Sequence, residues 1–224
     1  MAESPASHAV HHNPEVALDQ RLALKAAASR LQEEFGDRLG LDTIETLMQS
    51  SYDHFTAQAR IPNFVPLLAE RFTRQQLQAL ARIESTETDD KPTVLFLCTH
   101  NAGPSQMAMG LFTHLVGDQA LVWSGGSEPD TEINPAVLEA MAEIGIDITG
   151  EYPKPFTDEI VQAADVVITI GCRDACPVVS GKRYEDWDLP DTAGQSREAA
   201  AEVRDQIEQH VRRLVAELDL AVKD

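Results

Sequence analysis

The three cysteines of the chain, Cys98, Cys172 and Cys176, are the side chains best suited to chemistry. Cys98 opens the segment Cys-Thr-His-Asn-Ala-Gly-Pro-Ser, which lies between a short apolar run and a helical pattern. A strand–loop–helix corner aims backbone N–H groups and the positive end of a helix at one point, which makes an anion site. We expect this field, with a hydrogen bond from the Ser105 hydroxyl, to lower the pKa of Cys98 below about 8.5. The segment alone is compatible with a nucleophile for a tetrahedral oxyanion or with a buried structural cysteine.

Cys172 and Cys176 are separated by three residues, directly after another apolar run. Zinc sites generally use tighter cysteine pairs with further cysteines or histidines nearby, and this segment has none, so no metal site is expected. The two thiols are either inert and buried or partners in thiol–disulfide exchange.

Strands that alternate with helices after residue 92 predict a parallel sheet with helices on both faces. In chain order we expect strands and helices over 93–97, 105–115, 120–123, 135–144, 164–170, 184–187 and 196–220. Ligands of such sheets bind at the carboxyl ends of the strands. Cys98 and Cys172 each follow a predicted strand, so both are expected at that edge.

The chain before residue 92 shows only helical periodicity. Helices are predicted over 14–35, from 42 onward and over 65–83, and a capping box at Thr73 allows the third to be divided. We therefore expect an α/β domain preceded by an all-α three-helix bundle. The expected divisions are a flexible lead, a bundle, a linker and the α/β domain, over 1–13, 14–84, 85–92 and 93–224.

The composition excludes several functional classes. The 224 residues carry a net charge of −19, and 92–224 hold 23 acidic against 9 basic side chains. This charge argues against nucleic acid or anionic membranes as main partners. No run of eighteen apolar residues indicates a membrane span, and the first thirteen residues do not resemble a secretory signal. Three cysteines are too few for a secreted disulfide scaffold, so a cytoplasmic location is expected.

Residues 92–220 resemble the low-molecular-weight protein tyrosine phosphatase family, and within it the thioredoxin-type arsenate reductases. The family loop, Cys-x5-Arg-Ser, is matched at Cys98, Asn101, Gly103 and Ser105, followed by Gln-Met-Ala. Four further segments agree, at 124–129, 143–147, 171–177 and 187–194. The N-terminal bundle resembles a helical domain that precedes some actinobacterial members.

The resemblance implies a role for each matched residue. Cys98 would capture arsenate, Cys172 would attack its sulfur and release arsenite, and Cys176 would then take over the disulfide. Asp191 takes the place of the general acid, with Asp188 as its nearest rival and two solvated carboxylates as the alternative. The residues assigned to oxyanion binding are Thr99, His100, Asn101, Ala102, Gly103 and Arg173. Because cysteines four apart on a helix do not bridge easily, we expect residues 172–176 to unwind partly on oxidation.

The sequence departs from the family at Pro104, where the family has arginine. Proline supplies neither the planar charged fork of arginine nor a backbone N–H, although it suits the first turn of a helix. No Lys or Arg occurs between residues 92 and 153. Arg173, a protonated His100 and, with less support, Arg183 are the candidates for a replacement charge.

The sequence therefore predicts a cytoplasmic arsenate reductase for arsenic detoxification, with a redox-active disulfide and no bound cofactor. Its electrons would come from thioredoxin or a mycoredoxin-like dithiol protein. Three alternatives stay open: an oxyanion-binding or sensing protein that has lost the anion clamp, a protein tyrosine phosphatase, and a transferase for a low-molecular-weight thiol. The bundle is expected either to bind a partner, such as a second copy in a homodimer, or to cap the catalytic domain.

Overall fold

The computed structural model describes residues 14–58, 62–85, 91–171 and 181–223; of the side chains, those of residues 14–17, 58 and 62 are not described. The chain divides into two compact units, Met1–Arg74 and Gln75–Asp224. Each unit is described by itself below.

The first unit contains α1 (Pro14–Phe35), α2 (Leu41–Gln58), the 3-10 turn η1 (Pro62–Phe64) and the start of α3 (Val65–Glu84). One face of each helix is buried, with Leu31, Ile44 and Phe72 among the core residues. Glu70 of α3 binds Arg30 of α1 at 2.5 Å and Arg74 at 3.0 Å, which ties the helices together beside the apolar core. Together, the two guanidinium groups lower the pKa of Glu70 against the opposing effect of its burial.

The second unit is built on a four-stranded parallel sheet in the order β2-β1-β3-β4. The strands are β1 (Thr93–Cys98), β2 (Leu121–Gly126), β3 (Val166–Ile170) and β4 (Arg183–Trp187). All of β1 is buried, as expected for a central strand covered on both faces. Cys98 pairs in register with Gly126, and Ile170 pairs with Trp187, so the carboxyl ends of the strands form one edge.

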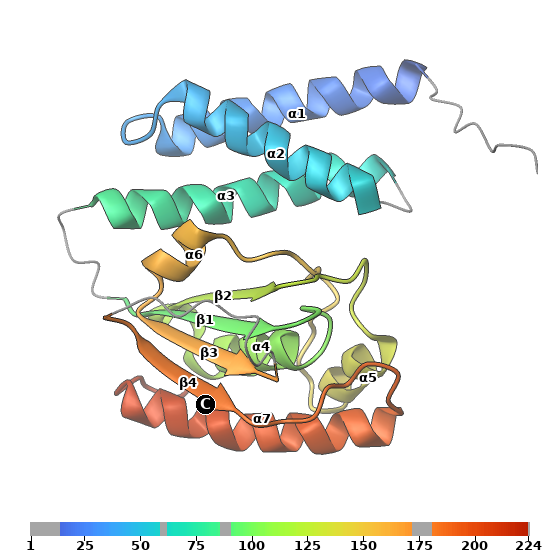
Figure 1. The fold of residues 1–224 in the computed structure, drawn as a ribbon, viewed down its shortest axis with the longest axis vertical. Helices are drawn as coiled ribbons and strands as arrows, with labels where there is room; N and C mark the ends of the chain where they lie inside the picture. The colour runs from blue at the N-terminus through green and yellow to red at the C-terminus, as the bar shows by residue number, and fades with distance from the viewer. Residues whose placement is uncertain (1–13, 59–61, 86–90, 172–180, 224) are drawn as a thin grey trace, which may run out of the picture. The chain divides into compact units, whose positions relative to one another are not determined.

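The helices of this unit are α4 (Pro104–Val116), α5 (Pro135–Glu143), α6 (Asp158–Ala163) and α7 (Arg197–Glu217), with the 3-10 turn η2 at Gly117–Gln119. Figure 1 shows α6 and α7 on opposite sides of the sheet. Apolar residues of α4, α5 and α7 form one core with the sheet, in which Phe96, Phe112 and Trp187 are almost fully buried. Asn134 and Ser196 cap α5 and α7 through their side-chain oxygens.

The predicted fold class is confirmed: a parallel sheet with helices, preceded by an N-terminal helical region. Dividing the third helix was wrong, because α3 is continuous from Val65 to Glu84. The Thr73 hydroxyl does not cap a helix but donates to Ser51 Oγ at 2.9 Å, on the neighbouring α2. The short helix α6 was not predicted. Within the described part of the chain, no helix is long and apolar enough to cross a membrane.

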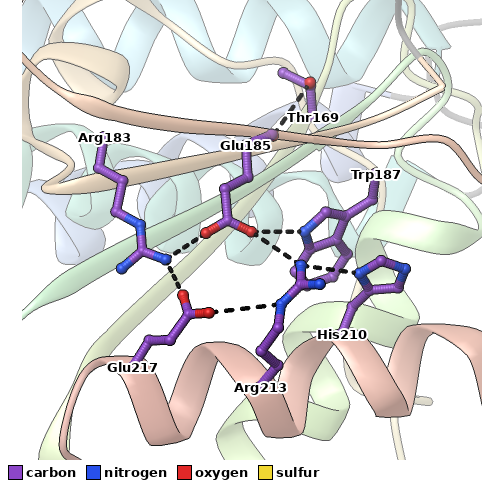
Figure 2. Close-up of polar contacts among 7 residues, drawn as sticks. All are labelled: Thr169, Arg183, Glu185, Trp187, His210, Arg213 and Glu217. Atoms are coloured by element: carbon purple, nitrogen blue, oxygen red, sulfur yellow. Dashed lines mark hydrogen bonds and ion pairs between the residues drawn. The ribbon is translucent and has the colours of Figure 1, made fainter.

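A charged network joins β4 to α7 (Figure 2). Glu185 accepts hydrogen bonds from Trp187 Nε1 at 3.1 Å and from Arg183, and lies 3.4 Å from Arg213. Both arginines also pair with Glu217. Burial raises the pKa of Glu185, but the Trp187 and Arg183 hydrogen bonds and the nearby positive charges outweigh it and hold the pKa below its usual value. The network fixes the strand that leads into the loop carrying Asp191.

Candidate active site

The Cys98 loop occupies the corner between the central strand and α4, as predicted. Cys98 is the last residue of β1, and Pro104 is the first residue of α4. The N–H groups of residues 106 and 107 bond to Gly103 O, so the helix begins at the loop's end. Gly126 faces the loop from β2: a Cβ there would lie 2.6 Å from Thr99 O, so only glycine allows this close approach.

Asn101 and Ser105 of the loop contact the Cys98 sulfur. The Asn101 N–H donates to Sγ at 3.1 Å, and Ser105 Oγ lies 2.9 Å from Sγ. Ser105 Oγ accepts a hydrogen bond from Asn101 Nδ2 at 2.9 Å, which leaves the hydroxyl proton to be donated to the sulfur. The arrangement therefore holds Sγ as an acceptor, which suits the thiolate form.

Asn101 organises the loop from inside. Its side chain is fully buried, and its backbone is left-handed with φ of 48°, a conformation that asparagine tolerates better than most residues. Asn101 Oδ1 accepts from Gln106 Nε2 at 3.1 Å and from the Lys154 N–H at 3.0 Å. Because Nδ2 is held by Ser105, the amide is oriented without ambiguity.

The prediction of a lowered pKa for Cys98 was wrong. Cys98 is only 4% exposed, and burial raises the pKa of its thiol. Hydrogen bonds from Ser105 and Asn101 lower it, the negative charge of Asp191 raises it, and the net shift is upward. Dipoles and a hydroxyl do not offset desolvation here, where no full positive charge of the described residues stands beside the sulfur.

Pro104 fits its position locally but brings no charge. It occupies the first turn of α4, where its missing N–H leaves no helix bond unmade.

Lys154 is the first basic residue after the segment 92–153, which contains no Lys or Arg. It contacts the loop through its backbone N–H, which donates to Asn101 Oδ1, and the sequence did not reveal this contact. Its Nζ donates to Tyr152 O at 3.3 Å, lies 3.7 Å from Glu151 and stacks over the Tyr152 ring.

Asp191 lies beside the thiol loop, where the sequence placed it. Its Oδ2 is 4.0 Å from His100 Nε2, and its charge raises the pKa of Cys98. His100 Nδ1 lies 4.0 Å from Asp130 and 3.3 Å from Glu128 O. The imidazole therefore stands between two carboxylates, at the side of the loop that carries the predicted general acid.

The remaining predicted residues divide into those the structure brings to the loop and those it does not. Thr99 and Ala102 belong to the loop itself, half-buried and buried respectively. Cys172, Cys176 and Arg173 lie outside the described residues. Arg183 is engaged with Glu185 and Glu217 in the β4–α7 network, so it is not poised for the oxyanion.

Sequence reasoning missed Asn134 and Thr192, both of which touch the loop. Asn134 precedes Pro135, an asparagine–proline pair that signals the start of a helix. The backbone N–H of Asn134 donates to Ala102 O of the thiol loop. Its side-chain Nδ2 donates to Thr192 O at 2.7 Å, and because the two residues are 58 positions apart this contact has no local sequence signature.

A family model described as low molecular weight phosphotyrosine protein phosphatase matches residues 93–224. The chain belongs to this family. A second model, the N-terminal domain described as protein-tyrosine-phosphatase-like, matches residues 24–81, within the helical region that precedes the sheet.

Relatives within the family carry the name arsenate reductase. Arsenate reductase 2 of Staphylococcus epidermidis is 38% identical over 122 residues, covering 53% of this chain and 92% of the relative. Arsenate reductase 2 of Staphylococcus saprophyticus is 37% identical over 127 residues, covering 55% of this chain and 95% of the relative. Among solved structures, the thioredoxin-dependent arsenate reductase of Corynebacterium glutamicum matches at 37% identity and a TM-score of 0.79, covering 88% of this chain and 96% of that one. The chain is thus similar to proteins named arsenate reductase, and its match to the Corynebacterium glutamicum structure extends beyond residues 93–224.

Proposed function

We propose that this protein reduces arsenate to arsenite, with Cys98 as the nucleophile. The observation that carries the proposal is the Cys98 corner, where Asn101 N–H and Ser105 Oγ both contact the sulfur at the edge where α/β sheets bind ligands. The identity to the Corynebacterium glutamicum relative over most of both chains supports the choice of arsenate as substrate.

The proposed reaction balances as three exchanges. The Cys98 thiolate bonds to As(V), and an arsenate oxygen leaves as water after receiving a proton from Asp191. The Cys172 thiolate attacks Cys98 Sγ, the S–As electron pair stays on arsenic, and As(III) leaves as arsenite. Cys176 attacks Cys172, which frees Cys98 and leaves a Cys172–Cys176 disulfide. A thioredoxin-type dithiol then supplies two electrons and two protons to restore both thiols.

Oxyanion binding in this proposal depends on neutral donors. Backbone N–H groups of the loop and the positive end of α4 supply partial charges, and His100 would add a full charge only in its protonated form. Asp130 and Asp191, both 4.0 Å from His100, place negative charge beside the loop that repels an anion. We expect the site to bind the oxyanion more weakly than a loop with arginine at residue 104.

A second candidate function is oxyanion binding without turnover. It is favoured by Pro104 and by the upward shift in the pKa of Cys98, because a protonated thiol is a poor nucleophile. A protein tyrosine phosphatase would use the same loop, but hydrolysis requires no second and third thiol.

Arsenate-dependent oxidation of reduced thioredoxin separates these functions. It would be followed for the natural chain, for Pro104→Arg and for Cys98→Ser, with hydrolysis of p-nitrophenyl phosphate measured in parallel. Turnover by the natural chain that Cys98→Ser abolishes is the expected result. Turnover by Pro104→Arg alone would favour the binding protein. Phosphate-ester cleavage without thioredoxin oxidation in either chain would favour the phosphatase.

The proposal also covers the domain division, the cellular location and the partner of the N-terminal bundle. The division into a bundle over 14–84, a linker over 85–92 and a catalytic domain over 93–224 agrees with where the two family models match. A cytoplasmic location would give the thiols the reducing surroundings they need. A second copy of the chain is one proposed partner of the bundle, and mass measurement in solution tests it.

A further inference from the structure

Asn134 connects three segments that meet at the candidate site. Its backbone N–H donates to Ala102 O of the thiol loop at 3.0 Å. Its Oδ1 accepts from the Ala136 N–H at 3.0 Å and so caps α5. Its Nδ2 donates to Thr192 O at 2.7 Å, in the loop that carries Asp191. One residue therefore holds the nucleophile's loop, a helix start and the predicted acid's loop together.

Thr192 makes a second contact between the same two loops. Its side chain is 1% exposed, and its Oγ1 fills the space where a side chain on residue 103 would begin: a Cβ there would lie 2.0 Å from it. Among the described residues this hydroxyl has no hydrogen-bond partner. The contact with Gly103 is therefore steric, and the directional part of the attachment comes from Asn134.

The position of Asp191 follows from this attachment. Asp191 directly precedes Thr192, and its Oδ1 accepts from the Ala193 N–H at 3.2 Å, which orients the carboxylate within the loop. Asp191 is exposed and has no buried packing of its own to fix it. Its distance from the thiol thus depends on where Thr192 is held, and its own contact with the thiol loop is the longer approach of Oδ2 to His100 Nε2 at 4.0 Å.

We propose that Asn134 is a positioning residue that fixes Asp191 over the Cys98 loop through the hydrogen bond from Nδ2 to Thr192 O. The inference rests on the proposed function, in which Cys98 is the nucleophile and Asp191 the acid. Without Nδ2 the Thr192 carbonyl keeps the Gln195 N–H at 3.1 Å, which belongs to its own segment and does not reach the thiol loop. The acid's loop is then held to the thiol loop by the steric contact with Gly103 and by the approach of Asp191 to His100 at 4.0 Å. Small displacements of a catalytic group cost about 100-fold in rate, so the effect on turnover is measurable.

The test uses substitutions that separate the two side-chain functions of Asn134. Asn134→Ser keeps a neutral capping oxygen for α5 but is too short to reach Thr192 O, whereas Asn134→Ala loses both functions. Thr157→Ala is the matched control, because Thr157 caps α6 through its side chain in the same unit. Asp191→Asn gives the effect of removing the acid itself.

The first measurement is the pH dependence of Cys98 alkylation by iodoacetamide, which requires no turnover. It is made in chains that also carry Cys172→Ala and Cys176→Ala, so that Cys98 is the only thiol. Asp191→Asn removes a charge that raises the pKa of Cys98, so its alkylation midpoint falls. We expect Asn134→Ser to lower the midpoint in the same direction, Thr157→Ala to leave it unchanged, and Asn134→Ser to add nothing once Asp191→Asn is present.

The second measurement is turnover with the natural cysteines, in which Asn134→Ser is expected to lower the rate about 10- to 100-fold and Thr157→Ala not at all. An unchanged alkylation midpoint in Asn134→Ser or in Asp191→Asn overturns the inference, as do midpoint shifts that add in the double variant. Absence of turnover in every chain, including Pro104→Arg, would instead refute the proposed function. The alkylation midpoints alone would then show whether Asn134 positions Asp191 beside Cys98.

Discussion

The thiol loop and the β4–α7 network surround their acidic groups differently: the Cys98 thiol is buried, whereas Glu185 is half-buried and the network residues Arg213 and Glu217 are exposed. In the network, Glu185 and Glu217 meet Arg183 and Arg213, so opposite charges compensate one another (Figure 2). At the loop, the partners of the sulfur among the described residues are the Ser105 hydroxyl and backbone N–H groups of Asn101 and Ser105, which carry no full charge. The comparison teaches that hydrogen bonds from neutral donors do not offset the full burial of the Cys98 sulfur, whereas hydrogen bonds and opposite charges together outweigh the partial burial of Glu185.

The two regions also differ in whether their polar atoms have hydrogen-bond partners. Around the loop, buried oxygens without a hydrogen-bond partner in the described part of the chain belong to Gln106, Ser124, Ser127 and Thr192. The carboxylate oxygens of Glu185 both have partners. Further buried atoms without a hydrogen-bond partner in the described residues belong to Gln32, His54, Gln75 and Thr93, outside the loop, so this feature is not specific to the site.

The largest expected effect comes from placing a charge where the loop has none. Pro104→Arg should raise kcat/KM for arsenate about 100- to 1000-fold, because a charged fork stabilises the oxyanion, and should lower the pKa of Cys98. The measurement is thioredoxin oxidation across a range of arsenate concentrations, with the pH dependence of Cys98 alkylation. Pro104→Ala is the control, since it restores the N–H without a charge. Equal gains in both variants would show that the backbone donor, not the charge, is what the loop lacks.

A smaller effect tests whether the loop is held sterically. Gly103→Ala would place a Cβ 2.0 Å from Thr192 Oγ1, so it should destabilise the protein by about 1–3 kcal/mol. The measurement is chemical unfolding of the full chain. Gly150→Ala is the control, because no atom lies within 4 Å of its added Cβ. Adding Thr192→Ala should remove most of the cost, and a cost that persists would refute the contact.

These features differ in how far the sequence could reveal them. Apolar runs predicted the strands, and the position of Cys98 after the first strand placed the thiol at the carboxyl edge of the sheet. Asp191 was placed by its resemblance to a family pattern. The contact between Asn134 and Thr192 joins residues that are 58 positions apart in the sequence. The pKa of Cys98 depends on how deeply the folded domain buries its sulfur. No local sequence pattern indicates either feature.

A pH-dependent effect of about 1–1.5 kcal/mol is expected in the network. The lowered pKa of Glu185 means that the folded protein binds its proton less readily than the unfolded chain. The carboxylate therefore contributes stability above the ordinary glutamate pKa, and this contribution is lost as pH falls through the lower folded-state pKa. Glu185→Gln should reduce stability at pH 7 and abolish this part of the acid dependence, as measured by urea unfolding between pH 7 and pH 3.

The matched control for that experiment is Glu208→Gln, which removes an ion pair with Arg212 along the surface of α7. Exposed pairs of this kind contribute little, so its unfolding curve should stay close to that of the natural chain. The comparison also predicts that Glu185→Gln leaves the alkylation of Cys98 unchanged. A changed alkylation midpoint would show that the two regions are coupled electrostatically.

The smallest effect concerns the hydroxyl beside the sulfur. Ser105 Oγ receives its hydrogen bond from Asn101 Nδ2, so its proton points to Sγ, and Ser105→Ala removes the side chain that lowers the pKa of Cys98. The pKa should rise further, and alkylation at pH 7 should slow about fivefold, the equivalent of roughly 1 kcal/mol for one hydrogen bond. Ser124→Ala is the control, because it removes a buried hydroxyl that has no partner among the described residues. Ser105→Thr keeps the hydroxyl and should restore the rate. If Ser105→Ala reacts as fast as the natural chain, the Ser105 hydroxyl does not influence the pKa of Cys98. Its function would then be to orient the side chain of Asn101.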